Sequence, residues 1–178
     1  MATNQTSEEL KSRVAAHLAQ DPRAMTPIMA REFGVPEVEI IRALPTEQSA
    51  ELRIGENRTL ELLHALERLG RVHVSASNEG CTLEAYGHFG EFSVTGPFFN
   101  VQTKTLDMHI KYRELTAAFA VIKPSHQDGQ TTYSIQFFTQ SGNAAFKVFL
   151  YKSVTEADGG EVSRSIAQWQ AIREAHQP

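Results

Sequence analysis

The sequence is poor in the features that define several large classes of protein. Its 178 residues include a single cysteine, Cys81, so no disulfide framework can form within the chain. One free thiol fits a reducing compartment better than a secreted one. The polar start, MATNQTSEELKSRV, lacks the apolar stretch of a signal peptide, and no apolar run is long enough to span a bilayer. These absences predict a cytoplasmic protein without membrane insertion.

Positive charge is not in excess, and the familiar catalytic motifs are missing. Lys and Arg number 17 against 21 Asp and Glu, which gives a net charge of −4. Because phosphate contacts need clustered cations, this balance weighs against nucleic acid as a partner. The chain has no H-E-x-x-H or C-x-x-C pair, no G-x-S-x-G elbow and no glycine-rich phosphate loop. The motifs therefore predict no catalytic residues.

What the sequence does contain is a change of apolar period near Gly70. Before it, apolar residues recur every three to four positions and predict helices over residues 7–20 and 57–69, with two short helices within 26–45. After it the period falls to two, and strands are predicted over 71–77, 81–86, 91–95, 98–102, 106–112, 117–123, 131–139 and 144–151, with a closing helix over 161–176. This order predicts an α+β fold with N-terminal helices, a large antiparallel β-sheet meander and flanking helices.

The chain divides into an N-terminal helical segment, residues 1–50, and an antiparallel sheet domain, residues 51–178, which we expect to form one compact unit. The two short helices, separated near Gly34, have the outline of a helix-turn-helix. However, Glu37 and Glu39 stand where a recognition helix needs cationic or amide side chains. A structural helix pair packed on the sheet is therefore the better interpretation.

Seven histidines are many for this length. Five lie in predicted helices or turns, where structural or solvated roles are commoner: His17, His64, His88, His126 and His176. The other two, His73 and His109, lie on the more polar faces of predicted strands. On pattern alone each is more often a solvated side chain than a ligand.

Several segments resemble a known family in their order and spacing. GRVHVSASNEGCTLE, GPFFNVQ, LDMHIKYRELTAAFAVIKPS and SIQFFTQSGNAAFKVFL are similar to the repeated half of the HemS/ChuS-like haem-trafficking proteins of bacteria. The chain length and MAREFGVPEVEIIRALP are more similar to the single-domain haem carriers of the same superfamily, which are HutX/ChuX-like. The resemblance covers roughly residues 25–155. It implies cytosolic haem binding over the sheet or beside it, by a homodimer that imitates the two-half proteins.

The resemblance also implies an axial ligand. The family commonly has a histidine where this chain has His109, so that residue carries over directly. A second histidine position of the single-domain carriers matches Ser77, which puts ligation by two histidines in doubt. His73 faces the same side of the strand as Ser77, but about 13 Å away at 3.3 Å per residue, so it would need a different haem pose.

Other residues near His109 are weighed as parts of a haem site. The haem propionates could bind to the cations Lys111, Arg113 and Lys104. Alternatively, these three side chains lie on a sheet edge that is exposed to solvent. Candidates to line an apolar slot are Phe98, Phe99, Met108 and Phe119, for which a core role is the commoner one.

The resemblance leaves three functions open. The leading hypothesis is a non-enzymatic carrier that hands haem to a haem-degrading partner. The second is an enzyme that degrades haem, which would need an open position on the iron. The third, a helix-turn-helix regulator, is disfavoured by the acidic helix residues.

Overall fold

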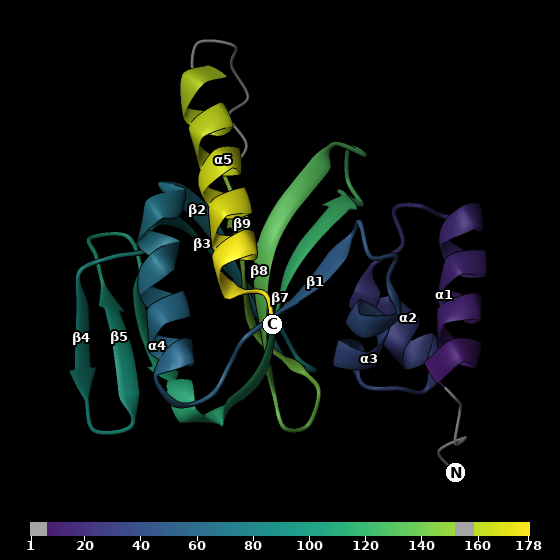
Figure 1. Ribbon diagram of the computed structural model, residues 1–178, viewed down its shortest axis with the longest axis horizontal. Coiled ribbons are helices and arrows are strands. Elements are labelled where there is room, and N and C mark those ends of the chain that lie inside the picture. The colour runs from purple at the N-terminus through teal and green to yellow at the C-terminus, as the bar shows by residue number, and fades with distance from the viewer. Residues whose placement is uncertain (1–6, 152–158) are drawn as a thin grey trace.

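A computed structural model describes residues 7–151 and 159–178 of the chain, without the side chain of Glu56, and contains both predicted kinds of element (Figure 1). The helices are α1 (Ser7–Gln20), α2 (Thr26–Phe33), α3 (Glu37–Ala43), α4 (Glu56–Ala65) and α5 (Gly159–His176), with short 3₁₀ turns η1 (Leu66–Leu69) and η2 (Tyr112–Glu114). The strands are β1 (Ser49–Leu52), β2 (Arg71–Ser77), β3 (Thr82–His88), β4 (Phe92–Thr95), β5 (Phe98–Gln102), β6 (Asp107–Lys111), β7 (Leu115–Pro124), β8 (Thr131–Thr139) and β9 (Ala144–Leu150). The α+β prediction is confirmed.

The strands form two antiparallel sheets. The large sheet has six strands in the order β1-β7-β8-β9-β2-β3 and contains the predicted meander of β7, β8 and β9. The small sheet has the order β4-β5-β6. The chain leaves the large sheet just after β3, where Glu91 has a left-handed backbone with φ 52°. The predicted run of antiparallel strands is thus divided between two sheets, which sequence periodicity did not reveal.

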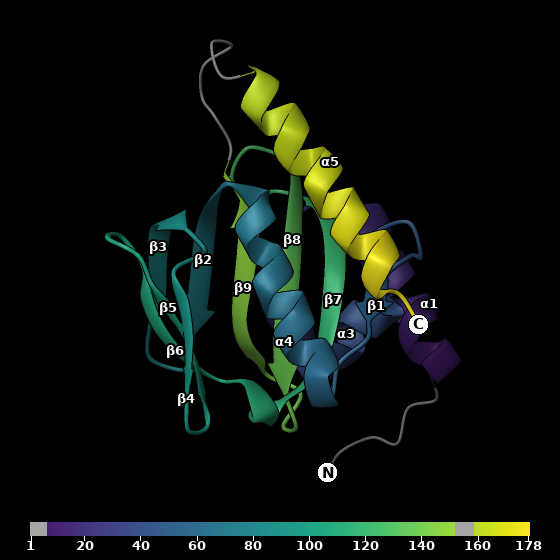
Figure 2. The same ribbon diagram turned by 60° about the vertical axis from the view of Figure 1, so that its left-hand side comes forward.

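The main core lies between the two sheets and two helices. In Figure 2, α4 and α5 run across one face of β7, β8 and β9, and the small sheet lies beside them. The buried residues of the main core come from all these layers and include Leu62 and Leu63 of α4, Trp169 of α5 and Phe137 of β8. The Trp169 indole donates a hydrogen bond to the Ser134 carbonyl at 3.0 Å, so even this buried N–H has a partner.

A second core attaches the N-terminal helices to the opposite face of the large sheet. Ile40 and Ile41 of α3 are fully buried, and the cluster includes Phe119 of β7 and Phe138 of β8. Helix α3 is therefore packed on the sheet, as the structural interpretation of the helix pair predicts. None of the helices within residues 7–151 and 159–178 combines the length and the apolar character that crossing a lipid bilayer requires.

A buried ion pair joins these helices to β9. The Lys147 Nζ lies 2.5 Å from Glu37 Oε1, and the Thr26 hydroxyl donates to the same oxygen at 2.6 Å. Both charged side chains are largely buried, so each relies on the other for its compensation. The acidic residue that argued against DNA binding therefore has a structural partner.

The turn between β8 and β9 touches α3 through Gly142. This glycine has φ +78°, and a Cβ placed there would lie 2.5 Å from Pro36 Cβ and 3.0 Å from Val38 Cγ1. The Val38 N–H also donates to the Gly142 carbonyl at 3.0 Å. Only glycine satisfies both the backbone conformation and the close approach.

We expect Gly142→Ala to lower the free energy of unfolding by about 2–4 kcal/mol, through left-handed strain and overpacking together. Gly96→Ala is the matched control, because Gly96 has φ +57° but no atom within 4 Å of the added Cβ. Its cost should be the strain alone, about 1–2 kcal/mol. Urea denaturation measures both, and equal losses in the two variants would contradict the close contact with α3.

Candidate functional site

His109 lies at the centre of β6, on the face of the small sheet that turns away from the core. Leu106 and Ile110 are buried, whereas Asp107, His109 and Lys111 are exposed. The predicted alternation of this strand is confirmed. The imidazole side chain is 57% exposed, so a ligand can reach it.

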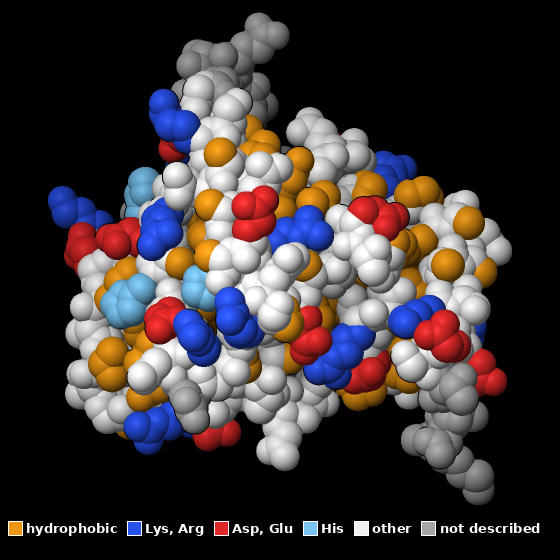
Figure 3. All heavy atoms as spheres, viewed as in Figure 1, with side chains coloured by type: hydrophobic (Ala, Val, Ile, Leu, Met, Phe, Trp, Pro, Cys, Tyr) orange, Lys and Arg blue, Asp and Glu red, His pale blue; other side chains and the backbone are white. Residues whose placement is uncertain are grey.

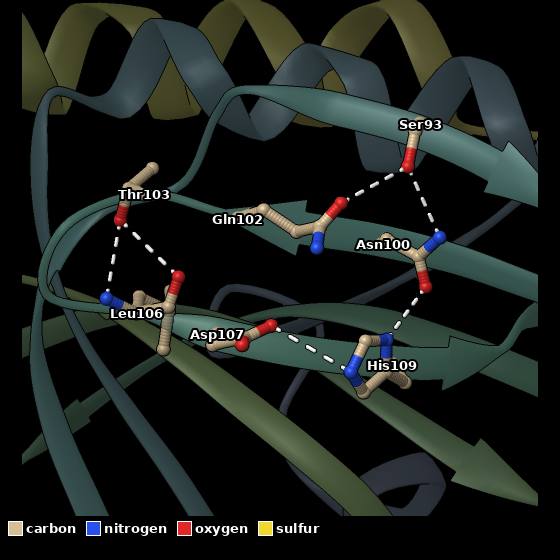
Figure 4. A network of polar contacts seen from close by, with 7 residues as sticks. All are labelled: Ser93, Asn100, Gln102, Thr103, Leu106, Asp107 and His109. Carbon is tan, nitrogen blue, oxygen red and sulfur yellow. Dashed lines mark hydrogen bonds and ion pairs between the residues drawn. The ribbon is translucent and has the colours of Figure 1, made fainter.

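The imidazole is held by a neighbour on β5. Its Nδ1 lies 2.7 Å from the Asn100 Oδ1, as Figure 4 shows, and Asn100 faces His109 directly in the β5–β6 register. An amide oxygen only accepts hydrogen bonds, so Nδ1 donates. The other nitrogen, Nε2, lies 3.7 Å from Asp107 Oδ1, which is too far for a hydrogen bond. His109 thus presents a nitrogen lone pair outward.

A cavity of about 620 Å³ opens beside His109, between β6, the end of β2 and the β8–β9 turn. Its size falls in the usual range of small-molecule sites. Its lining is Ala76, Met108, His109, Ile110, Lys111, Glu114, Leu115, Thr139, Gln140, Ser141, Ala145 and Phe146. It therefore combines apolar walls with one imidazole, one cation and a few polar groups.

The remaining candidates near His109 differ in whether they line the cavity. Lys111 is exposed and lines the cavity with His109. Arg113 is exposed but lies outside that lining, with its guanidinium 5.6 Å from the Tyr112 ring centroid. Phe99 is fully buried on the opposite face of β5, against Phe92, so it does not face His109.

Of the two neighbouring candidates Phe98 and Phe99, Phe98 is the one that lies on the same face of the small sheet as His109. It shares its strand face with Asn100, and its ring centroid lies 6.3 Å from that of His109. Phe98 pairs with Lys111, and Asn100 pairs with His109. Once this register is known, strand alternation places Phe98 on the face of His109. Phe98 was among the candidates for an apolar slot, whereas Asn100 had no signal of its own in the sequence.

Ser77 lies next to the cavity but not in its lining. Its hydroxyl is 2.9 Å from the Thr82 hydroxyl across β2 and β3. The preceding residue, Ala76, lines the cavity and pairs with Leu83, whose side chain is exposed. The end of β2 therefore offers the cavity the small apolar side chain of Ala76 and not the hydroxyl of Ser77.

His73 lies on the other face of the large sheet from Ala76. Its ring stacks on Tyr86 with centroids 4.6 Å apart and on Phe149 at 5.6 Å. Its Nε2 is 3.3 Å from Glu84 Oε1 but has no hydrogen-bond partner. The structure therefore does not bring His73 and His109 to one site.

His64 of α4 also lies away from His109. Its ring makes edge contacts with Phe92 and Phe99, which face the core side of the small sheet. Figure 3 shows histidine side chains gathered on this side of the molecule, near α4 and the small sheet, with charges of both signs interspersed around them. Among the residues that the structure describes, His109 is the one histidine in the cavity lining.

Comparison with known proteins places these observations in a family. The profile described as the haemin-degrading HemS.ChuX domain matches residues 34–176. The intracellular heme transport protein HutX of Vibrio cholerae is 26% identical over 173 residues, which is 96% of this chain and 86% of that protein.

Solved structures share the fold. The crystal structure of ChuX superposes with a TM-score of 0.76 at 19% identity, covering 91% of this chain and 96% of that one. Holo-PhuS, a heme-binding protein from Pseudomonas aeruginosa, gives a TM-score of 0.78 at 25% identity. That match covers 98% of this chain but 46% of PhuS, so this chain corresponds to about half of it.

Proposed function

Because the chain belongs to the family of haemin-degrading HemS.ChuX domains, we propose that it binds haem inside the cell and carries it to a protein that consumes it. The similarity to a heme transport protein and to a heme-binding protein supports this role. The observation that carries the proposal is the exposed imidazole of His109 beside a cavity with apolar walls.

The residues around this cavity fit a haem group in their chemistry. When bound, haem would supply an iron atom whose axial position takes a neutral imidazole nitrogen. His109 would offer Nε2, since Nδ1 is engaged with Asn100. The partly buried lining residues Met108 and Ala145 would contact the apolar macrocycle, and Lys111 would meet a carboxylate of the propionates.

Of three further candidates, one has a minor role in the proposed haem site and two have none. Arg113 would help attract the propionates from outside the cavity. Ser77 cannot replace the imidazole that related carriers are expected to have, because a hydroxyl is a poor ligand for haem iron. His73 would need a second haem pose on the other face of the sheet, and we give it no part in the main site.

We predict that His109→Ala weakens binding of haemin by about 100-fold or more and shifts the Soret band, because the axial nitrogen is lost. Titration of purified apoprotein with haemin measures both changes. His126→Ala is the control, since His126 is exposed in the β7–β8 turn, at the opposite ends of β7 and β8 from the lining residues Leu115 and Thr139. Unchanged affinity and spectrum in His109→Ala would overturn the ligand assignment.

A haem-degrading activity is the second candidate function, and one observation favours it. Within the described residues no second histidine lines the cavity, so a bound haem would find one histidine there to hold its iron. An open side would let oxygen bind, whereas a carrier protects the iron.

Ascorbate added to the haem complex distinguishes the two functions. A carrier should keep its Soret band in the presence of catalase, which removes the peroxide that bleaches haem non-enzymatically. Loss of the band at the same rate with and without catalase would instead establish degradation. His109→Ala serves as the comparison, because it should abolish any enzymatic component.

We also propose that the chain forms a homodimer, in which a second copy stands where PhuS and ChuS have their other half. The chain covers 46% of PhuS and 48% of ChuS. The outer face of β9, β2 and β3 is the surface that the N-terminal core leaves uncovered, since that core reaches only β7, β8 and the start of β9. His73, Tyr86 and Phe149 stack there, and Tyr86 is 48% exposed.

Sedimentation equilibrium tests this surface. Wild type should sediment as a dimer, and Tyr86→Glu should weaken the association by about tenfold or more, as loss of an aromatic anchor does. Val94→Glu is the control, because Val94 is a similarly exposed apolar residue on the small sheet. A monomeric wild type at all accessible concentrations would contradict the dimer, and equal effects of the two variants would contradict the surface.

A further inference from the structure

We propose that Asn100 is a positioning residue that holds His109 in one tautomer, with the proton on Nδ1 and the lone pair of Nε2 directed outward. The role of that lone pair toward iron rests on the proposed haem binding. The tautomer itself does not, because the groups that set it belong to the apoprotein.

The first support is the burial and register of Asn100. It lies on the outward face of the small sheet, yet only 6% of it is exposed. It is opposite Ser93 on β4 and opposite His109 on β6, so the three polar side chains form a row across the sheet (Figure 4). A buried amide in such a row needs its hydrogen bonds satisfied, which restricts how it can turn.

The second support is the direction of the hydrogen bonds. The Asn100 Nδ2 donates to the Ser93 hydroxyl at 3.1 Å, and that hydroxyl donates to the Gln102 Oε1 at 3.2 Å. A hydroxyl has one proton, and Ser93 gives it to Gln102, so toward Asn100 the hydroxyl can only accept. The amide oxygen of Asn100 is then left for His109, and His109 must donate from Nδ1.

Asp107 acts at two points of this row. Its Oδ1 lies 3.7 Å from Nε2 of His109, beyond hydrogen-bond distance, so the bond between Nδ1 and Asn100 sets the tautomer. At the Gln102 end, Asp107 favours this direction over the reverse one. It lies opposite Gln102 in the β5–β6 register, and a carboxylate only accepts hydrogen bonds. The amide nitrogen of Gln102 is therefore better placed toward Asp107, and its oxygen toward Ser93. Reversing every bond in the row would turn the amide oxygen of Gln102 toward the carboxylate, which is repulsive.

The group that accepts the Nδ1 proton of His109 also affects how strongly Nε2 binds a metal. Metal-bound histidines commonly donate their second N–H to a carboxylate, a carbonyl or water, and this partner tunes ligand basicity. A neutral amide oxygen polarises the imidazole less than a carboxylate would. His109 would therefore be an oriented ligand of moderate strength, which suits a protein that must release what it binds.

The direct test is the tautomer of His109 in the apoprotein, read by long-range ¹H–¹⁵N NMR of protein labelled in histidine, at a pH where the ring is neutral. Wild type should show one form, protonated at Nδ1. Asn100→Ala should give a mixture or the opposite form, and Asn100→Asp should keep the Nδ1 proton because a carboxylate oxygen still accepts it. Thr95→Ala, on the same face of the small sheet, should change nothing.

The haem complex supplies a second readout. Asn100→Ala should weaken haemin binding by about tenfold, the lower end of what loss of such a partner costs. The iron–imidazole stretching frequency of the ferrous complex should rise in Asn100→Asp and fall in Asn100→Ala. If Asn100 has a purely structural role, that frequency and the tautomer should be unchanged in both Asn100→Asp and Asn100→Ala. This result would overturn the inference.

The two proposals fail in different ways. If haemin does not bind wild type, the proposed function fails, while the NMR measurement on the apoprotein still decides the role of Asn100. If wild-type His109 carries its proton on Nε2, the inference about Asn100 fails even where haemin binds.

Discussion

Burial of Leu106 and Ile110 is the constraint on which the candidate site depends. Leu106 directly before β6 and Ile110 within it both enter the main core, and full burial of such a side chain contributes about 1.5–3 kcal/mol. Because side chains alternate along a strand, fixing these two inward fixes His109 outward. A shift of one residue would expose both and bury the imidazole, so the packing of β6 holds the register.

The same arrangement explains why the cavity lies where it does. β6 is an edge strand of the small sheet, and the cavity uses that edge together with the end of β2 and the β8–β9 turn. The turn is in contact with α3 through Gly142, and β9 is tied to α3 by the Lys147–Glu37 ion pair. The N-terminal helices therefore support one wall of the cavity without contributing residues to its lining.

Much of this arrangement was predictable from local patterns, and the rest depends on pairing between strands. The change of period at Gly70, the order of elements and the outward position of His109 all follow from the spacing of apolar residues. The separate small sheet does not, because it depends on the backbone turn at Glu91. The sequence did not separate Phe98 from Phe99 and did not point to Asn100, and the cause is the same, since both need the register of β5 on β6. Only the resemblance to haem-binding proteins singled out His109 from His73, because the two have the same local pattern.

The measurement that tests the central claim most directly is a crystal structure of the chain with haem bound. The account predicts iron coordinated by Nε2 of His109, with Nδ1 still within hydrogen-bond distance of the Asn100 oxygen and the porphyrin against Met108 and Ala145. Iron held by His73 or His64, or haem bound away from β6, would contradict it.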